Sequence, residues 1–101
     1  MKILAVTACP FGIAHTYMAA EMIQLACEKA DIECKVETQG SLGIENVITE
    51  EDVKSADAVI LTTDMPIKDV GRFENIEKIM VSISDAIKET DVIIQKLISN
   101  K

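Results

Sequence analysis

The sequence predicts a single α/β domain of three layers, in which a four-stranded parallel sheet carries helices on both faces. Strand-like apolar segments alternate along the chain with helix-like segments, which is the pattern of strands joined by helical crossovers. The chain has 101 residues, enough for one domain with a sizeable core. Its composition of 49% hydrophobic and 3% aromatic residues suits a core of Ile, Val, Leu, Met and Ala. No repeat or linker divides the sequence, so we expect residues 1–101 to form one domain.

The first half of the chain predicts a strand, a helix and a second strand. Lys2 to Thr7 is an apolar run that predicts a buried strand, and Ala14 to about Ala30 has the periodicity of a helix. Outside one polar stripe, the faces of that helix are apolar, and we expect Met18 and Met22 to fill the core there. Residues 33–38 alternate like a strand, and the glycines of 39–43 predict a loop. The polar stripe of the helix consists of Tyr17, Glu21, Gln24, Glu28 and Asp31.

The second half predicts two more strands and two helical segments. A capping-box pattern at Thr49 opens a short helix, and residues 58–62 predict a third buried strand. Residues 64–66, which include Pro66, then break the chain. After a connector containing Arg72-Phe73, we expect a fourth strand over residues 78–81 and a helix over residues 84–98 that is interrupted near Thr90-Asp91.

Four such strands are expected in the order 2-1-3-4, a shortened relative of the flavodoxin-like arrangement. The chain then reverses direction across the sheet at the carboxyl end of the first strand, and ligands of open α/β sheets bind at such a point. Cys9 falls there. The loop from Thr62 to Pro66, after the third strand, should face it and make Asp64 a possible neighbour.

Cys9 stands between the first strand and the first helix, within the segment Cys9-Pro10-Phe11-Gly12-Ile13-Ala14-His15-Thr16. A helix start offers backbone N–H groups without internal partners and the positive end of the helix dipole. Both favour an anion and lower the pKa of a nearby thiol. We therefore expect a reactive thiolate and a phosphate cradle in one segment.

Composition excludes several functional classes. A formal net charge of −7 disfavours a sequence-independent nucleic-acid binder, which needs a face rich in Lys and Arg. No apolar stretch approaches the ~20 residues that span a bilayer, and no signal peptide is evident, so we expect a cytoplasmic chain that does not insert into membranes. The three cysteines lack metal-ligand spacing, and no metal site is predicted. Cys27 and Cys34 fit the pattern of small buried hydrophobes.

The chemistry narrows further because of what the Cys9 segment lacks. No Gly-Lys-Ser/Thr occurs, so direct transfer from ATP in a P-loop is not expected. Gly12 occupies the place that a dithiol oxidoreductase gives to its second cysteine. The spacing of a cysteine phosphatase loop is matched, but His15 stands where such a loop carries Arg, and Thr16 follows. What remains is a cysteine that accepts a phosphoryl group and passes it on.

The chain resembles the fructose-type enzyme IIB domain of the bacterial phosphoenolpyruvate-dependent sugar phosphotransferase system. The resemblance rests on residues 5–21 and continues through residues 36–46, Arg72-Phe73 and residues 84–86, so it covers essentially the whole chain. It implies that Cys9 takes a phosphoryl group from a phosphohistidine of the IIA component. The group then passes to a sugar held by the membrane component IIC, at whose inner face the chain would associate.

The resemblance also assigns the rest of the segment to phosphate binding: Pro10, Phe11, Gly12, Ile13, Ala14, His15 and Thr16. His15 either donates to the phosphate or holds the loop, and Thr16 either bonds the sulfur or phosphate or satisfies loop backbone. Phe11 departs from the family pattern, which most often has a small hydroxyl residue there. We expect no cofactor and no need for Mg²⁺, because backbone N–H groups can meet the dianionic charge.

Two alternatives remain open. The chain could hydrolyse phosphate esters like a low-molecular-weight phosphatase, or it could be a regulatory module whose docking surface is switched by phosphorylation. The identity of the sugar and the oligomeric state are not specified by the sequence.

Overall fold

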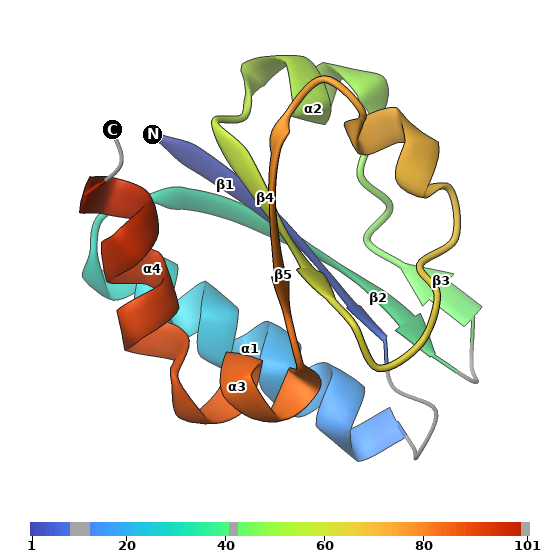
Figure 1. Cartoon of the computed structure of the whole chain (residues 1–101), viewed down its shortest axis with the longest axis horizontal. Helices are drawn as coiled ribbons and strands as arrows, with labels where there is room; N and C mark the ends of the chain where they lie inside the picture. The colour runs from blue at the N-terminus through green and yellow to red at the C-terminus, as the bar shows by residue number, and fades with distance from the viewer. Residues whose placement is uncertain (9–12, 41–42, 100–101) are drawn as a thin grey trace.

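A computed structural model describes residues 1–8, 13–40 and 43–99, and Figure 1 shows the arrangement of its helices and strands. In chain order the elements are β1 (Lys2–Ala8), α1 (Ile13–Lys29), β2 (Glu33–Gly40), β3 (Gly43–Glu45), α2 (Glu50–Ser55), β4 (Ala58–Thr62), the 3₁₀-helix η1 (Val70–Phe73), β5 (Glu77–Val81), α3 (Ile83–Lys88) and α4 (Thr90–Ser99).

The strands form one sheet in the order β3-β2-β1-β4-β5. Strands β2, β1, β4 and β5 pair in parallel, in the order expected for the four predicted strands. The prediction of a wholly parallel, four-stranded sheet was nevertheless wrong, because β3 adds a fifth, antiparallel strand beside β2. Gly40 pairs with Gly43, whose φ of +111° suits glycine, so residues 39, 40 and 43 of the predicted loop belong to strands, and residues 41–42 lie outside the described residues.

Alternate residues of the central strands face two separate hydrophobic cores, as the two-residue period of a strand requires. Ile3 and Ala5 of β1 belong to the core under α1, α3 and α4. Leu4 and Val6 belong to the core on the other face, with Phe73 of η1 and with α2 packed against it. Helices therefore cover both faces of the sheet, and the three predicted layers are present (Figure 1).

The helical boundaries agree closely with the sequence pattern. The interruption expected near Thr90 separates α3 from α4, and Thr49 caps α2 in a capping box with Asp52. Cys27 is buried and Cys34 is half-buried against the same core, so Cys34 only partly meets its prediction.

The expected burial of Met18 and Met22 was wrong. Their side chains are 47% and 38% exposed, since the face of α1 that packs on the sheet is formed by Ala19, Ile23 and Ala26 instead. Helix α1 thus has apolar side chains both toward the core and toward solvent.

No helix in the described part of the chain is long and apolar enough to cross a membrane. Among the same residues, no group of three or more His, Cys, Asp or Glu side chains is placed to hold a metal ion.

Candidate functional site

The candidate site lies at the carboxyl end of β1, where the chain passes into α1. Ala8 ends the strand and Ile13 begins the helix. The predicted site residues Cys9, Pro10, Phe11 and Gly12 lie between them, outside the described residues. The other predicted members of the segment, residues 13–16, form the first turn of α1. The structure therefore describes the strand end that precedes the segment and the helix start that forms its second half.

In the first turn of α1, no acidic side chain offsets the positive end of the helix dipole. The first N–H groups of a helix lack intrahelical partners and concentrate the positive end of its dipole. The first turn of α1 contains no Asp or Glu, whereas the first turns of α2, α3 and α4 contain Glu50, Asp85 and Asp91, among others. Among the α-helices of the described residues, α1 is the one whose amino end is left open to an added anion.

Thr16 places a hydroxyl in this first turn. Its side chain is only 1% exposed, and its Oγ1 has no hydrogen-bond partner among the described atoms. A buried hydroxyl without a partner costs free energy, so such groups are rare outside sites where a ligand satisfies them. The sequence left open whether Thr16 bonds the Cys9 sulfur or phosphate or satisfies the loop backbone, and among the described residues its Oγ1 has no other partner.

Two other buried hydroxyls hold the strand and helix ends next to residues 9–12. Thr7 Oγ1 donates to the Thr16 carbonyl at 3.0 Å, which ties β1 to the first turn of α1. Thr62 Oγ1, at the end of β4, accepts a hydrogen bond from the Ala8 N–H at 3.0 Å. Both threonines are 1% exposed or less, so neither bond competes with bulk water.

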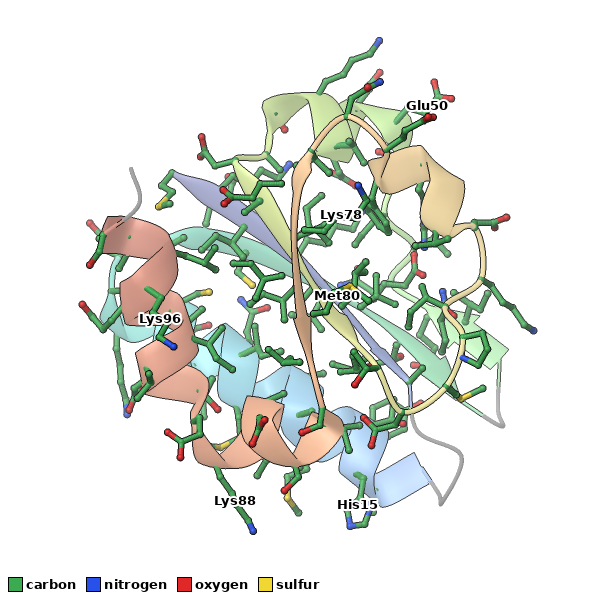
Figure 2. All side chains as sticks on the ribbon, viewed as in Figure 1. His15, Glu50, Lys78, Met80, Lys88 and Lys96 are labelled. Carbon is green, nitrogen blue, oxygen red and sulfur yellow. The ribbon has the colours of Figure 1, made fainter. Side chains whose placement is uncertain are left out.

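His15 is exposed at the edge of a hollow of about 310 Å³ between α1 and α3. In Figure 2, His15 and Lys88 project at the same end of the molecule, from α1 and α3 respectively. The sequence predicted no lysine near the site, and it could not have done so, because Lys88 reaches this hollow only through tertiary packing. The hollow is lined by His15, Met18, Ile83, Ser84, Ile87 and Lys88.

Asp64 has a structural partner. Its Oδ1 accepts a hydrogen bond from the Ile83 N–H at 2.6 Å, so the carboxylate stabilises the start of α3. The segment predicted to face Cys9, from Thr62 to Pro66, lines a hollow of about 460 Å³ at the carboxyl end of β4, together with Met80 of β5. Cys9 lies outside the described residues, so a contact between Asp64 and Cys9 stays a prediction.

A buried ion pair, not anticipated from the sequence, joins β2 to η1. Glu37 is fully buried in β2, and Arg72 of η1 approaches both of its carboxylate oxygens at 2.7 and 2.6 Å. Gln39 and the Ile48 N–H donate to the same carboxylate at 2.7 and 2.8 Å. Burial raises the pKa of Glu37, but these hydrogen bonds outweigh it and leave the pKa below its ordinary value. No signal in the sequence marked Glu37, because it continues the charged alternation of Glu33 and Lys35 along β2.

Comparison with known proteins gives consistent matches over nearly the whole chain. The family described as "PTS system, Lactose/Cellobiose specific IIB subunit" matches residues 4–96. The chain is 56% identical over 96 residues to the PTS system fructose-like EIIB component 2 of Escherichia coli K12, covering 95% of this chain and 91% of that protein. It is also 41% identical over 102 residues to the fructose-like PTS system EIIBC component of the same organism, covering 99% of this chain and 21% of that longer protein.

Among solved structures, a domain of the fructose-specific IIABC component from Borrelia burgdorferi superposes with a TM-score of 0.90 at 50% identity. The match covers 95% of this chain and 91% of that domain.

Proposed function

The chain belongs to the PTS IIB family as a fructose-type component with phosphotransferase activity, and we propose that Cys9 is the residue through which the phosphoryl group passes. In this proposal the Cys9 thiolate attacks the phosphorus of a phosphohistidine on a IIA partner. The P–N bond breaks, the P–S bond forms, and the imidazole of the partner leaves. A hydroxyl of a sugar bound by the membrane component IIC then attacks the same phosphorus, and the thiolate leaves.

The observation that supports this proposal best is the composition of the first turn of α1. It combines a first turn without acidic side chains and the buried hydroxyl of Thr16, which has no hydrogen-bond partner among the described residues, directly after residues 9–12. Phosphoryl transfer proceeds through a loose transition state, whose charge is stabilised by donors already in position. The backbone N–H groups of residues 13–15 and Thr16 Oγ1 are such donors. We infer that they bind the phosphoryl oxygens, and that His15 adds a further donor from the exposed side.

The surface next to this turn suits a protein partner. The partner has to bring its phosphohistidine against the Cys9 segment, so it covers the adjoining part of α1. Met18 and Met22 lie exposed there at one-turn spacing, beside the hollow lined by Lys88. Methionine side chains adapt to different partners, and IIB has to meet IIA and IIC in turn. We infer that this face binds IIA, on the cytoplasmic side of the membrane. The EIIBC name of the fused relative supports IIC as the second partner.

The phosphatase alternative receives less support. A hydrolase needs a general acid for the leaving group, and the one carboxylate that the sequence placed near the loop, Asp64, is engaged by the Ile83 N–H. A carrier, in contrast, has to retain its phosphocysteine until the acceptor arrives. The lifetime of the phosphocysteine in water therefore distinguishes a carrier from a hydrolase.

The direct test is the intact mass of the protein after incubation with phosphoenolpyruvate, the two general phosphotransferase proteins and a fructose-type IIA. We expect one phosphoryl adduct on the native chain and on Cys27→Ser, and none on Cys9→Ser. Cys27→Ser is the matched control, because Cys27 is buried in the core rather than at the loop. An adduct on Cys9→Ser, or rapid loss of the adduct to water on the native chain, would contradict the carrier function.

A further inference from the structure

Two buried threonine hydroxyls bind the backbone on either side of residues 9–12, Thr62 at Ala8 and Thr7 at Thr16, and neither threonine belongs to the first turn of α1. Thr7 is the penultimate residue of β1, and Thr62 is the last residue of β4. Both side chains lie on the α1 face of the sheet, because they continue the alternation of Ile3 and Ala5 in β1 and of Ala58 and Ile60 in β4. A hydrophobic side chain would continue both patterns, so the hydroxyls call for a separate explanation.

The Thr62 hydroxyl replaces backbone pairing where the β1–β4 ladder ends. The last register pair of these strands is Val6 with Leu61. Beyond it, Thr62 Oγ1 accepts from the Ala8 N–H at 3.0 Å, and it lies 3.3 Å from the Ala8 carbonyl oxygen. Because the hydroxyl can both accept and donate, it fixes the two polar backbone groups of the residue that precedes Cys9.

The Thr7 hydroxyl fixes the other end. It donates to the carbonyl of Thr16 at 3.0 Å, nine residues along the chain, and this bond is fully buried. Thr16 also carries the Oγ1 that we infer binds phosphate and that has no partner among the described atoms. Thr7 therefore sets how far the first turn of α1 stands from the end of β1, which is the span that residues 9–12 have to bridge.

We propose that Thr7 and Thr62 are positioning residues for phosphoryl transfer: their hydroxyls hold the two ends of the Cys9 segment at the spacing that the thiolate and the phosphate need. The proposal rests on the function proposed above. Transition-state stabilisation depends on donors held within a few tenths of an ångström, and misplacement by about 1 Å can cost about 100-fold in rate. Hydroxyls can supply this stiffness beyond the last register pair of the β1–β4 ladder, Val6 with Leu61.

The test replaces each threonine by the isosteric Val and measures two properties of Cys9. The first is the rate of Cys9 alkylation by iodoacetamide as a function of pH, with the modified peptide identified by mass spectrometry. The second is the protection of Cys9 from that reagent by inorganic phosphate. In Thr62→Val and Thr7→Val we expect the alkylation profile to move to higher pH and phosphate protection to weaken about 2- to 10-fold, the equivalent of one hydrogen bond. Thr62→Ser keeps the hydroxyl and should restore both values.

Thr90→Val is the matched control. Thr90 is also a buried threonine, and its hydroxyl donates to the Ala86 carbonyl, but it lies at the junction of α3 and α4 rather than at an end of the Cys9 segment. This variant should lose stability to urea as the others do, while its alkylation profile and phosphate protection stay at wild-type values.

The outcomes separate the two proposals. If the native chain acquires no phosphoryl group on Cys9 from any IIA donor, the proposed function fails whatever the threonine variants do. If the native chain is phosphorylated but Thr7→Val and Thr62→Val keep its pH profile and phosphate protection, the positioning role is overturned. An equal change in Thr90→Val, or no rescue by Thr62→Ser, would show that the Thr7 and Thr62 hydrogen bonds contribute to stability alone, and would overturn the positioning role. Should Thr62→Val lose its native circular dichroism spectrum, Thr7→Val tests the same role from the other end.

Discussion

Replacing Thr16 by Val should stabilise the free protein and weaken its hold on phosphate, two effects of opposite sign from one atom. The side chain is 1% exposed and its hydroxyl has no partner among the described atoms, whereas Val has nearly the same shape without the hydroxyl. If the hydroxyl served the fold, its removal would cost stability. If it waits for a ligand, its removal relieves a penalty in the unliganded state and creates one in the liganded state.

The magnitudes follow from the cost of an unsatisfied buried polar group. Leaving a buried donor or acceptor without a partner costs about 1–3 kcal/mol, so Thr16→Val should raise the free energy of unfolding by up to that amount. A hydrogen bond to a charged group contributes about 1.5–3 kcal/mol. At about 1.4 kcal/mol per factor of ten, its loss should weaken phosphate binding, and slow transfer to Cys9, about 10- to 150-fold.

Two measurements check this prediction on the same samples. Urea unfolding followed by circular dichroism at 222 nm gives the stability, and it suits a chain that has no Trp. The initial rate of Cys9 phosphorylation by excess phospho-IIA gives the function, with Thr16→Ser as the variant that keeps the hydroxyl. A loss of stability in Thr16→Val would show that the hydroxyl already has a partner in the free protein, and an unchanged transfer rate would remove it from the site. Either result refutes the reasoning.

Three further predictions concern the surroundings of the site. Arg72→Ala should lower the free energy of unfolding in urea at pH 7 by about 3–5 kcal/mol, because it leaves the buried carboxylate of Glu37 without its cation. Glu37→Gln should lower it less, since Arg72 still donates to the carbonyls of Asp69 and Ile48. The lowered pKa of Glu37 makes this stabilisation complete above its ordinary value of 4.5 and lost as the pH falls through the folded-state pKa. The gap in unfolding free energy between wild type and Arg72→Ala should therefore shrink as the pH falls below 4.5, and a constant or growing gap in that range would contradict the pairing. Asp64→Ala should lower stability by about 1 kcal/mol through the Ile83 N–H and leave the rate of Cys9 phosphorylation unchanged, whereas a large loss of rate with retained stability would make Asp64 part of the site. Addition of EDTA should not slow transfer from purified phospho-IIA to Cys9; inhibition that Mg²⁺ reverses would show that backbone donors do not suffice.

The parallel part of the fold could be predicted because its strands are continuous apolar runs separated by helices with recognisable caps. Residues 58–62 are buried throughout, and Thr49 forms the capping box that its spacing to Asp52 indicates. The fifth strand could not be found in the same way. Its residues, Gly43–Glu45, are all exposed, so no hydrophobic period marks them, and the strand exists because it pairs with β2.

The site was predictable only where its residues are contiguous in the sequence. The strand, the cysteine segment and the helix start follow one another, and the start of α1 lies where the pattern placed it. The contributions of Thr62, Lys88 and Arg72 could not be predicted, because each depends on which side chains the packing of distant elements brings together. The predicted strand order placed Asp64 near Cys9, because the loop after the third strand faces the loop after the first. The role of Asp64 in stabilising the start of α3 is evident only from its hydrogen bond to the Ile83 N–H.

The formal net charge of −7 makes this chain an unpromising receptor for a phosphoryl group, which adds roughly −1.5 to −2 charges. The distances between most acidic side chains and the Cys9 loop explain why the net charge does not prevent phosphorylation. Charges separated by more than about 8 Å are largely screened at physiological ionic strength, and the molecule extends 34 × 28 × 18 Å, so acids on remote helices contribute little at the loop.

What acts locally is the first turn of α1, where acidic residues are absent. Two acids near this end of the sheet already have partners: Glu45 is bonded by the Tyr17 hydroxyl and Asp64 by the Ile83 N–H. The chain can therefore remain acidic overall, which disfavours binding to nucleic acid, while the one helix end beside Cys9 stays positive. Placing an acid in that turn, as in Ala14→Glu, should then slow phosphorylation of Cys9 far more than Ser99→Glu at the far end of α4, although the two variants have the same net charge.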